Sequence, residues 1–327
     1  MKAKARAIYF TAPGSIEMRQ EEIYPASGSI LVESRLIGIS HGTEMLFFRG
    51  ELPLGLDMDA AIEALRGKVS YPVKYGYMNT GVTETGRWVF AFYPHQDRFY
   101  VQEADTVPLP EGMNYEDAVF LANMETAVRI VQDAAPVLGD RILVVGQGVV
   151  GLLVAEILQR SHGGRIVTVE PYPKRREASQ QTGCVSLSPA EPRIEDRIRE
   201  LTDGRGVDVA INVSSSAQGL QLAIDSLAFS GKVVEASWYG DRSVALSLGS
   251  AFHRKRLKIV SSQVSTLAPE LAGRWTKERG IRFSLDLVGE ICPSKYITHR
   301  FPLGEAQEAF LLLSENPEET IQIVLVP

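Results

Sequence analysis

Residues 1–115 carry short apolar runs that alternate with glycine, proline and polar residues. Rich in residues that favour strands, these runs are ARAIYF (5–10), SILVESRLIGIS (29–40), RWVFAFYP (87–94), RFYVQ (98–102) and TVPLP (106–110). Their length and spacing predict a predominantly β region, built as a distorted barrel. One segment has a different pattern. In 56–68 (LDMDAAIEALRGK) apolar residues recur at helical spacing and Gly67 can end a helix, so we expect a helical insertion there.

From Asn114 onward the apolar period becomes helical and then alternates with strands. Asn114 can cap a helix over 114–134, with Glu116 and Asp117 in its first turn. We expect strands over 141–146, 165–170, 184–187, 207–213, 232–238 and 257–264, with helices over 149–160, 174–182, 195–204 and 217–231. Six strands with intervening helices predict a doubly wound parallel sheet. A helix over 304–316 and a strand over 321–327 are expected to return to the first domain.

Length and composition describe an ordinary globular chain with two domains. The 327 residues are enough for two cores, and the expected domains are 1–116 with 266–327 and, between them, 117–265. A net charge of −6 argues against nucleic acid or an anionic membrane as partner, and no apolar run is long enough for a membrane span. Only Cys184 and Cys292 are present, and no signal peptide is recognisable. We therefore expect no disulfide framework and a cytoplasmic location.

The most informative motif is Gly146-x-Gly148-x-x-Gly151, between an apolar strand and a helix. The first glycine permits a tight turn, the second lets the backbone approach a pyrophosphate, and the third lets the helix pack on the strand. The free N–H groups at the helix N-terminus favour phosphate. A second apolar strand ends at Glu170, where a carboxylate can accept hydrogen bonds from the adenosine ribose. The pattern predicts a nicotinamide dinucleotide site.

The acid at Glu170 favours NAD(H), because a carboxylate repels the 2′-phosphate of NADP(H). The basic run Lys174-Arg175-Arg176 could instead neutralise that phosphate, so NADP stays the less favoured alternative. Serines at the ends of later strands lie at the sheet edge where ribose and nicotinamide bind. The predicted cofactor-binding residues are Gly146, Gln147, Gly148, Val149, Val150, Gly151, Glu170, Lys174, Arg175, Ser214, Ser215, Ser237, Ser262 and Gln263. A second basic run, 254–256, is either a solvated cluster or a contact for an acidic group.

The whole chain resembles the medium-chain dehydrogenase/reductase superfamily. The resemblance is carried by GISHGTE (38–44), YPVKYGYMNTGVTETG (71–86), GQGVVG (146–151), LTDGRGVDVAINV (201–213) and PLGEAQEAF (302–310). It implies a Rossmann domain with a six-stranded parallel sheet, a β-rich GroES-like catalytic domain, and a homodimer. HGTEMLFFRG, YGYMNTG, FYPHQDRFYV and ITHRFPL are similar to a zinc-lacking branch, the 2-desacetyl-2-hydroxyethyl bacteriochlorophyllide dehydrogenase-like group.

Three departures from the zinc-containing members of this superfamily concern the metal. Those members place a Cys before Gly-Thr-Asp, where this chain has His41, and a His-Glu pair after a glycine, where Tyr77-Met78 follow Gly76. A third Cys or acid precedes their Rossmann strand, and residues 121–125 contain no Cys. Catalytic zinc needs three firm ligands. We therefore expect no metal, the alternative being a weak site built from His41 with Glu44 or Glu125.

Without a metal, hydride transfer at a carbonyl requires a proton donor or an oxyanion stabiliser. The positions aligned by the resemblance make His41, Tyr77 and Glu125 the catalytic candidates, with Thr43 as a relay hydroxyl. Each has a plain structural alternative: a capping histidine, a tyrosine packed at the site, an exposed helix residue. His95 is interpreted as structural, with substrate contact as the alternative.

These observations lead to one functional hypothesis and two alternatives. The hypothesis is a zinc-independent, NAD(H)-dependent oxidoreductase that interconverts a secondary alcohol and a ketone on a small to medium organic molecule. The first alternative is an NADPH-dependent quinone or enone reductase, against which Glu170 counts. The second is a dinucleotide-binding protein without turnover.

Overall fold

The computed structural model describes residues 2–59 and 61–327, and the chain divides into two compact units. Unit 1 is Met1–Ala122 with Leu285–Pro327, and unit 2 is Asn123–Ser284. From the sequence, the domain limits were expected at 116/117 and 265/266. The unit limits fall inside two helices, α3 (Leu121–Ala134) and α9 (Lys277–Ile291).

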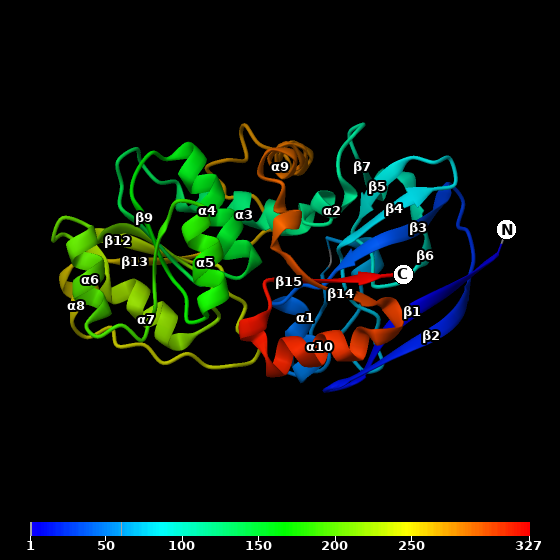
Figure 1. Cartoon of the computed structure of the whole chain (residues 1–327), viewed down its shortest axis with the longest axis horizontal. Helices are drawn as coiled ribbons and strands as arrows, with labels where there is room; N and C mark the ends of the chain where they lie inside the picture. The colour runs from blue at the N-terminus through cyan, green and yellow to red at the C-terminus, as the bar shows by residue number, and fades with distance from the viewer. Residues whose placement is uncertain (1, 60) are drawn as a thin grey trace. The chain divides into compact units, whose positions relative to one another are not determined.

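Unit 1 is built on a hairpin and a mixed seven-stranded sheet. The hairpin pairs β1 (Ala3–Ala12) with β2 (Ser15–Ile23). The sheet has the order β14-β15-β3-β4-β5-β7, and β6 also pairs with β3. Its strands are β3 (Ser29–Gly38), β4 (Asn79–Thr83), β5 (Trp88–Ala91), β6 (Arg98–Gln102), β7 (Thr106–Pro108), β14 (Ile297–Pro302) and β15 (Gln322–Val326). In Figure 1 the red strand β15 lies beside the blue β3, with which it pairs antiparallel.

Short helices cover the core of unit 1. They are α1 (Thr43–Arg49), α2 (Tyr115–Ala118) and α10 (Ala306–Glu315), with 3₁₀ turns η1 (Glu63–Leu65), η2 (Glu103–Asp105), η3 (Pro293–Tyr296), η4 (Leu303–Glu305) and η5 (Pro317–Glu319). Phe10 meets Phe310 edge-on, with ring centroids 5.3 Å apart, and Phe47 stacks on Tyr75 at 3.9 Å. These rings join β1, α1 and α10 into one core.

The helical insertion expected over 56–68 is wrong. Apart from residue 60, which lies outside the described residues, this segment is a loop whose one helical element is η1. Its two ends pair with each other, because Met58 N donates to Gly67 O and Val69 N donates to Leu56 O. Leu65 and Val69 are buried in the core of unit 1. The loop therefore brings Leu65 into the core, with Met58 and Ile62 partly buried against it, without forming an α-helix.

Unit 2 contains the six-stranded parallel sheet that the sequence predicts. The strand order is β10-β9-β8-β11-β12-β13, and all neighbouring pairs are parallel. The strands are β8 (Ile142–Val145), β9 (Ile166–Val169), β10 (Val185–Leu187), β11 (Val207–Asn212), β12 (Leu227–Glu235) and β13 (Lys258–Ser261). Every residue of β8 and β9 is buried, which is typical of central strands covered on both faces. The predicted fold class is confirmed.

The remaining helices of unit 2 are α4 (Val149–Ser161), α5 (Pro173–Gln181), α6 (Ile194–Leu201), α7 (Ala217–Asp225) and α8 (Ala251–Arg254). The helix expected over 217–231 ends at Asp225, because Leu227 already pairs with Val207 of β11. The helix expected over 195–204 ends at Leu201, where the Thr202 hydroxyl turns back to donate to Ile198 O. No helix among the described residues has the length and apolar character of a membrane span.

One long helix expected from the sequence is divided in the structure. The segment 114–134 forms α2 and α3, separated at Val119 and Phe120. The predicted cap is confirmed, since the Asn114 side chain accepts a hydrogen bond from Glu116 N. Both intervening residues are buried, so the break places two apolar side chains in the core.

Candidate functional site

In the turn from β8 to α4, the three glycines of the motif have different surroundings, and each lacks a side chain for a different physical reason. Gly146 has φ +95, and a Cβ there would lie 2.9 Å from Cα of Ser214 at the end of β11. A Cβ on Gly151 would lie 2.0 Å from Gly146 O, so only glycine lets α4 pack so closely on the turn. By contrast, a Cβ on Gly148 would meet no protein atom within 4 Å. The backbone is thus open at the one position where a pyrophosphate would approach.

Gly148 is the N-cap of α4 and makes no side-chain capping bond. Val149 and Val150 form the first turn, so their N–H groups lie at the helix N-terminus that favours phosphate. The residues present therefore fit the diphosphate of a nicotinamide dinucleotide.

Glu170 braces this turn from the end of β9. It is 2% exposed, and its Oε2 accepts from Gln147 N at 2.6 Å while Oε1 accepts from Tyr172 N at 3.0 Å. The Gln147 side chain is buried and donates to Gly146 O. The carboxylate thus fixes the loop backbone and holds a negative charge beside it. Whether Glu170 also binds ribose stays a prediction.

The basic residues after Glu170 are turned toward their own segment. Arg176 donates to the carbonyls of Glu170 and Pro171 at 2.9 and 2.6 Å, and the Arg175 guanidinium lies 4.9 Å from the centre of the Tyr172 ring. Lys174 is exposed at the start of α5. At least two of these cations therefore stabilise the turn into α5.

A polar network at the carboxyl ends of β11 and β12 joins the predicted serines. Ser214 Oγ donates to Asn212 Oδ1 at 2.7 Å, and Ser237 Oγ accepts from Ser215 N at 3.0 Å. Behind them, Glu235 accepts from Asn212 Nδ2 at 2.7 Å and from Ser237 N at 2.8 Å.

Tyr239 completes this network. Its hydroxyl lies 3.2 Å from both Glu235 Oε2 and Asn212 Nδ2, and burial and the Glu235 charge raise the pKa of Tyr239 to about 12. Sequence reasoning missed Asn212, Glu235 and Tyr239. An acid among the apolar residues of KVVEASW was the available signal, because a buried carboxylate requires partners.

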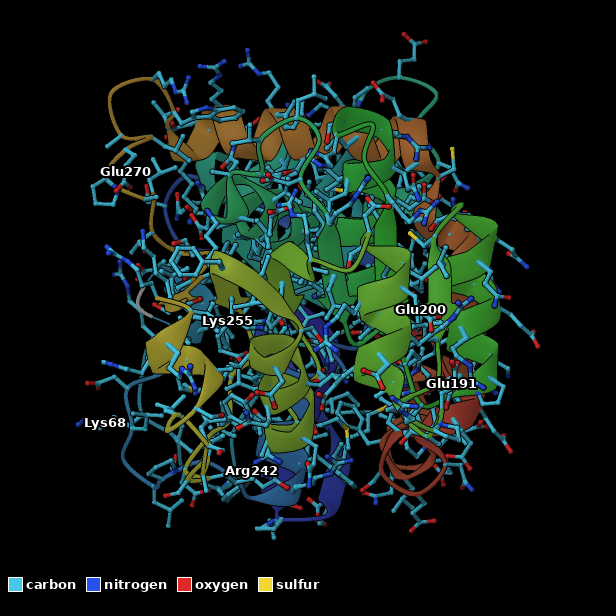
Figure 2. All side chains as sticks on the ribbon, turned by 90° about the vertical axis from the view of Figure 1, so that its left-hand side faces the viewer. Lys68, Glu191, Glu200, Arg242, Lys255 and Glu270 are labelled. Carbon is cyan, nitrogen blue, oxygen red and sulfur yellow. The ribbon has the colours of Figure 1, made fainter. Side chains whose placement is uncertain are left out.

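Two predicted residues follow β13. Ser262 Oγ donates to Asp133 Oδ2 at 2.6 Å, and burial raises the pKa of that carboxyl. Gln263 is exposed and its Oε1 accepts from Thr266 N. In the basic run 254–256, Lys255, labelled in Figure 2, donates to Leu227 O at 2.8 Å and ties α8 to the start of β12.

In unit 1 the structure brings Tyr77 to Ser40 and Thr43. Tyr77 Oη donates to Ser40 Oγ at 2.6 Å and also has a side-chain hydrogen bond with Thr43. Burial raises the pKa of Tyr77 to about 12, with a further contribution from the Glu44 charge. With this pKa the phenol stays protonated near neutral pH, so it has a proton to donate, and the raised pKa makes it a weaker acid than a free tyrosine.

His41 is oriented toward the C-terminal strand. Its Nε2 accepts a hydrogen bond from Ile323 N of β15 at 3.2 Å. This contact matches the structural alternative, in which a turn histidine binds backbone. Glu125 is a buried residue of α3 in unit 2. The catalytic roles of His41 and Glu125 stay predictions.

Glu44 and His95 form a buried pair beneath this site. Neither side chain is exposed, and His95 Nε2 lies 2.6 Å from Glu44 Oε2. The other carboxylate oxygen, Oε1, accepts from Ser40 N at 3.0 Å. The contact of His95 with an internal carboxylate agrees with its structural interpretation.

The donor set here does not fit a catalytic zinc. His41 Nε2 binds a backbone N–H, Glu44 is engaged by His95 and Ser40, and Tyr77 and Met78 replace the nitrogen and oxygen ligands. Nowhere in residues 2–59 and 61–327 do three His, Cys, Asp or Glu side chains gather as a metal site. We derive no step through zinc.

Comparison with known proteins agrees with this architecture. Residues 149–290 match the family model described as zinc-binding dehydrogenase. The chain is 30% identical to the zinc-type alcohol dehydrogenase-like protein YphC of Escherichia coli (strain K12), over 68% of this chain and 60% of YphC. It is 25% identical to D-guloside 3-dehydrogenase of the same organism, over 91% of this chain and 89% of that protein.

The fold matches a solved structure over its full length. The 2R,3R-butanediol dehydrogenase from Bacillus subtilis superimposes with a TM-score of 0.81 and 20% identity, covering 99% of each chain. This likeness extends the sequence match to both the β-rich unit and the Rossmann unit. In sequence and in fold the chain is therefore similar to zinc-type alcohol dehydrogenases, which supports a place in the medium-chain dehydrogenase/reductase superfamily of NAD(P)-dependent oxidoreductases.

Proposed function

We propose that this protein is a zinc-independent, NAD(H)-dependent oxidoreductase that interconverts a secondary alcohol and a ketone on a small to medium organic molecule. The observation that carries the proposal is the turn between β8 and α4, where Gly148 leaves open space at a helix N-terminus. The similarity to D-guloside 3-dehydrogenase and butanediol dehydrogenase supports an alcohol or polyol substrate.

Two groups of this chain have distinct tasks in the proposed reaction. When bound, the reduced nicotinamide supplies hydride to the carbonyl carbon. Tyr77 donates its hydroxyl proton to the carbonyl oxygen as negative charge develops there. The backbone N–H groups at the start of α4 bind the pyrophosphate and hold the cofactor in place.

The preference for NAD(H) rests on Glu170. Its carboxylate is buried at the end of β9 and beside the glycine turn, so a 2′-phosphate there would meet a like charge. Arg175 and Arg176 stabilise the turn into α5, which supports the same preference. Independence of zinc is supported by the occupied hydrogen-bonding groups of His41 and Glu44.

A turnover assay with both cofactors tests the proposal. The purified protein is incubated with NAD⁺ or NADP⁺ and a panel of secondary alcohols, polyols and glycosides, and with reduced cofactor and matching ketones. We expect turnover with NAD(H) that survives chelator treatment, and well below one zinc per chain by metal analysis. Stoichiometric zinc linked to activity would overturn the metal-free mechanism.

The same assay separates the two alternatives. Reduction of enones or quinones with NADPH alone would favour the reductase alternative. Tight NADH binding without turnover of any substrate in the panel would favour a protein that only binds the dinucleotide.

We further propose that the protein works in the cytoplasm as a homodimer that joins through β13. This strand ends the sheet order of unit 2, so one of its edges pairs with no other described strand. Val260 on this strand is 37% exposed and Phe229 on β12 is 68% exposed. Light scattering on the wild type and on Val260→Lys tests the dimer, which the lysine should weaken because it places charge on the joining edge.

A further inference from the structure

Four residues from separate segments of unit 1 form a continuous polar chain. His95 Nε2 contacts Glu44 Oε2 at 2.6 Å, Glu44 Oε1 accepts from Ser40 N at 3.0 Å, and Ser40 Oγ accepts from Tyr77 Oη at 2.6 Å. Each link is within hydrogen-bond distance. The chain therefore leads from a fully buried ionisable pair to a partly buried phenol.

The inner end of the chain is held rigidly. A Cβ on Gly76 would lie 2.5 Å from the His95 ring, so the ring is stacked against a backbone that only glycine permits. His95 N donates to Tyr75 O, and Phe310 meets the ring edge-on at 6.4 Å. Gly76 directly precedes Tyr77, so the same short segment packs against the His95 imidazole and positions the Tyr77 phenol.

The burial of this pair requires a reason. Removing an acid and an imidazole from water is costly, and apolar side chains of similar volume would pack at least as well. Among the described residues, His95 Nδ1 has no hydrogen-bond partner, so the polar contact of the imidazole ring is the one between Nε2 and Glu44. Glu44 in turn fixes the main chain at Ser40, beside the acceptor of the Tyr77 proton.

We propose that His95 and Glu44 are positioning residues that act through Ser40 to hold the Tyr77 hydroxyl in place as the proton donor of the reaction. This inference rests on the proposed function. In ketone reduction the Tyr77 hydroxyl turns its hydrogen from Ser40 Oγ to the carbonyl oxygen. The Tyr77 O–H bond then breaks and the alcohol O–H bond forms, while hydride from reduced nicotinamide makes the new C–H bond and the Ser40 hydroxyl donates to the phenolate that is left. The Tyr77 phenolate then regains a proton from water, so atoms and charge balance.

The first test is a kinetic double-mutant cycle between Tyr77→Phe and Ser40→Ala. In ketone reduction with NADH, Tyr77→Phe should lower kcat about 100-fold and Ser40→Ala about tenfold, with KM changed less than about twofold. The double variant should be no slower than Tyr77→Phe, because Ser40 acts only through the phenol. The matched control is Thr80→Val, which removes another buried hydroxyl of unit 1, from β4, and should keep kcat.

The second test requires no turnover. In protein labelled with ¹³Cζ-tyrosine, the deuterium-induced shift reports how fast the Tyr77 hydroxyl proton exchanges, and Tyr77→Phe assigns the signal. Ser40→Ala and Glu44→Gln should speed exchange about tenfold or more, because the hydroxyl loses its fixed acceptor. Thr80→Val should leave it unchanged. In Glu44→Gln, ¹⁵N-histidine spectra should also show the His95 proton moved from Nε2 to Nδ1, since the amide nitrogen then donates to Nε2.

The two tests distinguish this inference from the proposed function. A wild-type protein without ketone turnover but with slow, Ser40-dependent exchange at Tyr77 would retain the chain and overturn its catalytic purpose. Normal turnover with additive effects of Tyr77→Phe and Ser40→Ala, or fast exchange in the wild type, would overturn the positioning role and leave the oxidoreductase standing. Coupled kinetic effects with accelerated exchange in both Ser40→Ala and Glu44→Gln would establish it.

Discussion

The turn between β8 and α4 in unit 2 and the polar chain in unit 1 are built in opposite ways. The turn gathers the groups that face a cofactor from residues 142–170, within one strand–helix–strand unit. The polar chain gathers Ser40, Glu44, Tyr77 and His95 from three separate segments. The first depends on the space that glycines leave open, and the second on buried charge.

The difference teaches why the two regions respond differently to substitution. In the turn, the absence of a side chain at Gly148 is the functional feature, so a methyl group added there should change cofactor binding without changing stability. In the polar chain, each residue is a hydrogen-bond partner of the next, so removing one side chain leaves a buried polar group without its partner.

Glu44→Ala should have the largest effect. It leaves His95 buried without its carboxylate and Ser40 N without its acceptor, and should lower the free energy of unfolding by about 3 to 5 kcal/mol. Denaturant unfolding measures the loss. Glu33→Ala is the control, because Glu33 forms only exposed ion pairs and should cost less than about 1 kcal/mol. Equal costs would contradict the account of the buried pair.

Gly151→Ala comes next. Its Cβ would lie 2.0 Å from Gly146 O, so α4 must move away from the turn at a cost of about 1 to 3 kcal/mol. Thermal unfolding should show a lower Tm, and NADH should bind weakly because the turn is displaced. A variant with wild-type Tm would mean that α4 does not depend on this close approach.

Gly148→Ala should separate stability from binding. The new Cβ meets no protein atom within 4 Å, so Tm should stay near that of the wild type. The same methyl group occupies the space through which the pyrophosphate approaches, and the Kd for NADH should rise about tenfold or more. Titration calorimetry measures this. Unchanged affinity would show that the cofactor does not use this turn.

Glu170→Gln should have a smaller effect, which concerns both the affinity for NADH and the preference for NADH over NADPH. The amide keeps one acceptor and turns a donor toward the N–H of Gln147 or Tyr172, so the turn loosens and the Kd for NADH should rise about fivefold. Loss of the negative charge should also bring the Kd for NADPH closer to that for NADH. If the ratio of the two constants does not change, the basic residues of α5 determine cofactor choice.

The smallest effect concerns pH. Burial and the Glu44 charge raise the pKa of Tyr77 to about 12, and the donor is active in its protonated form. The kcat of ketone reduction should therefore not fall between about pH 7 and about pH 9.5 through loss of the Tyr77 proton. A pH–rate profile checks this. A tyrosine-dependent decline with an apparent pKa near 9, absent in Tyr77→Phe, would contradict it.

Much of unit 2 could be predicted from the sequence because its signals are local. The parallel strands are continuous apolar runs, and the glycine spacing from 146 to 151 lies between a strand and a helix that are adjacent in the chain. Only the close approach of Gly146 to Ser214 involves a distant segment. The errors lie at element ends, such as the helix that stops at Asp225. There, pairing of Leu227 with β11 overrides helical propensity.

The polar chain could not be predicted in the same way. Ser40 had no local signal, and His95 was interpreted only as structural or as a substrate contact, because the roles of both depend on contacts between distant segments. His95 is fixed by a glycine at position 76 and by a carboxylate in α1, and no periodicity relates these positions. The prediction for 56–68 was wrong for a similar reason, since its apolar spacing fits a helix as well as a loop closed by backbone hydrogen bonds that buries Leu65.

The place of β15 in the sheet has a consequence for synthesis on the ribosome. Its Val324 and Leu325 pair with Gly38 and Ile37 of β3, although all of unit 2 separates the two strands along the chain. Until β15 emerges, the nascent β3 carries unpaired backbone groups at this end, next to the segment that holds Ser40 and His41. Unit 2 can fold during this interval, whereas unit 1 waits with an open sheet edge, the kind of surface that chaperones cover and aggregates extend.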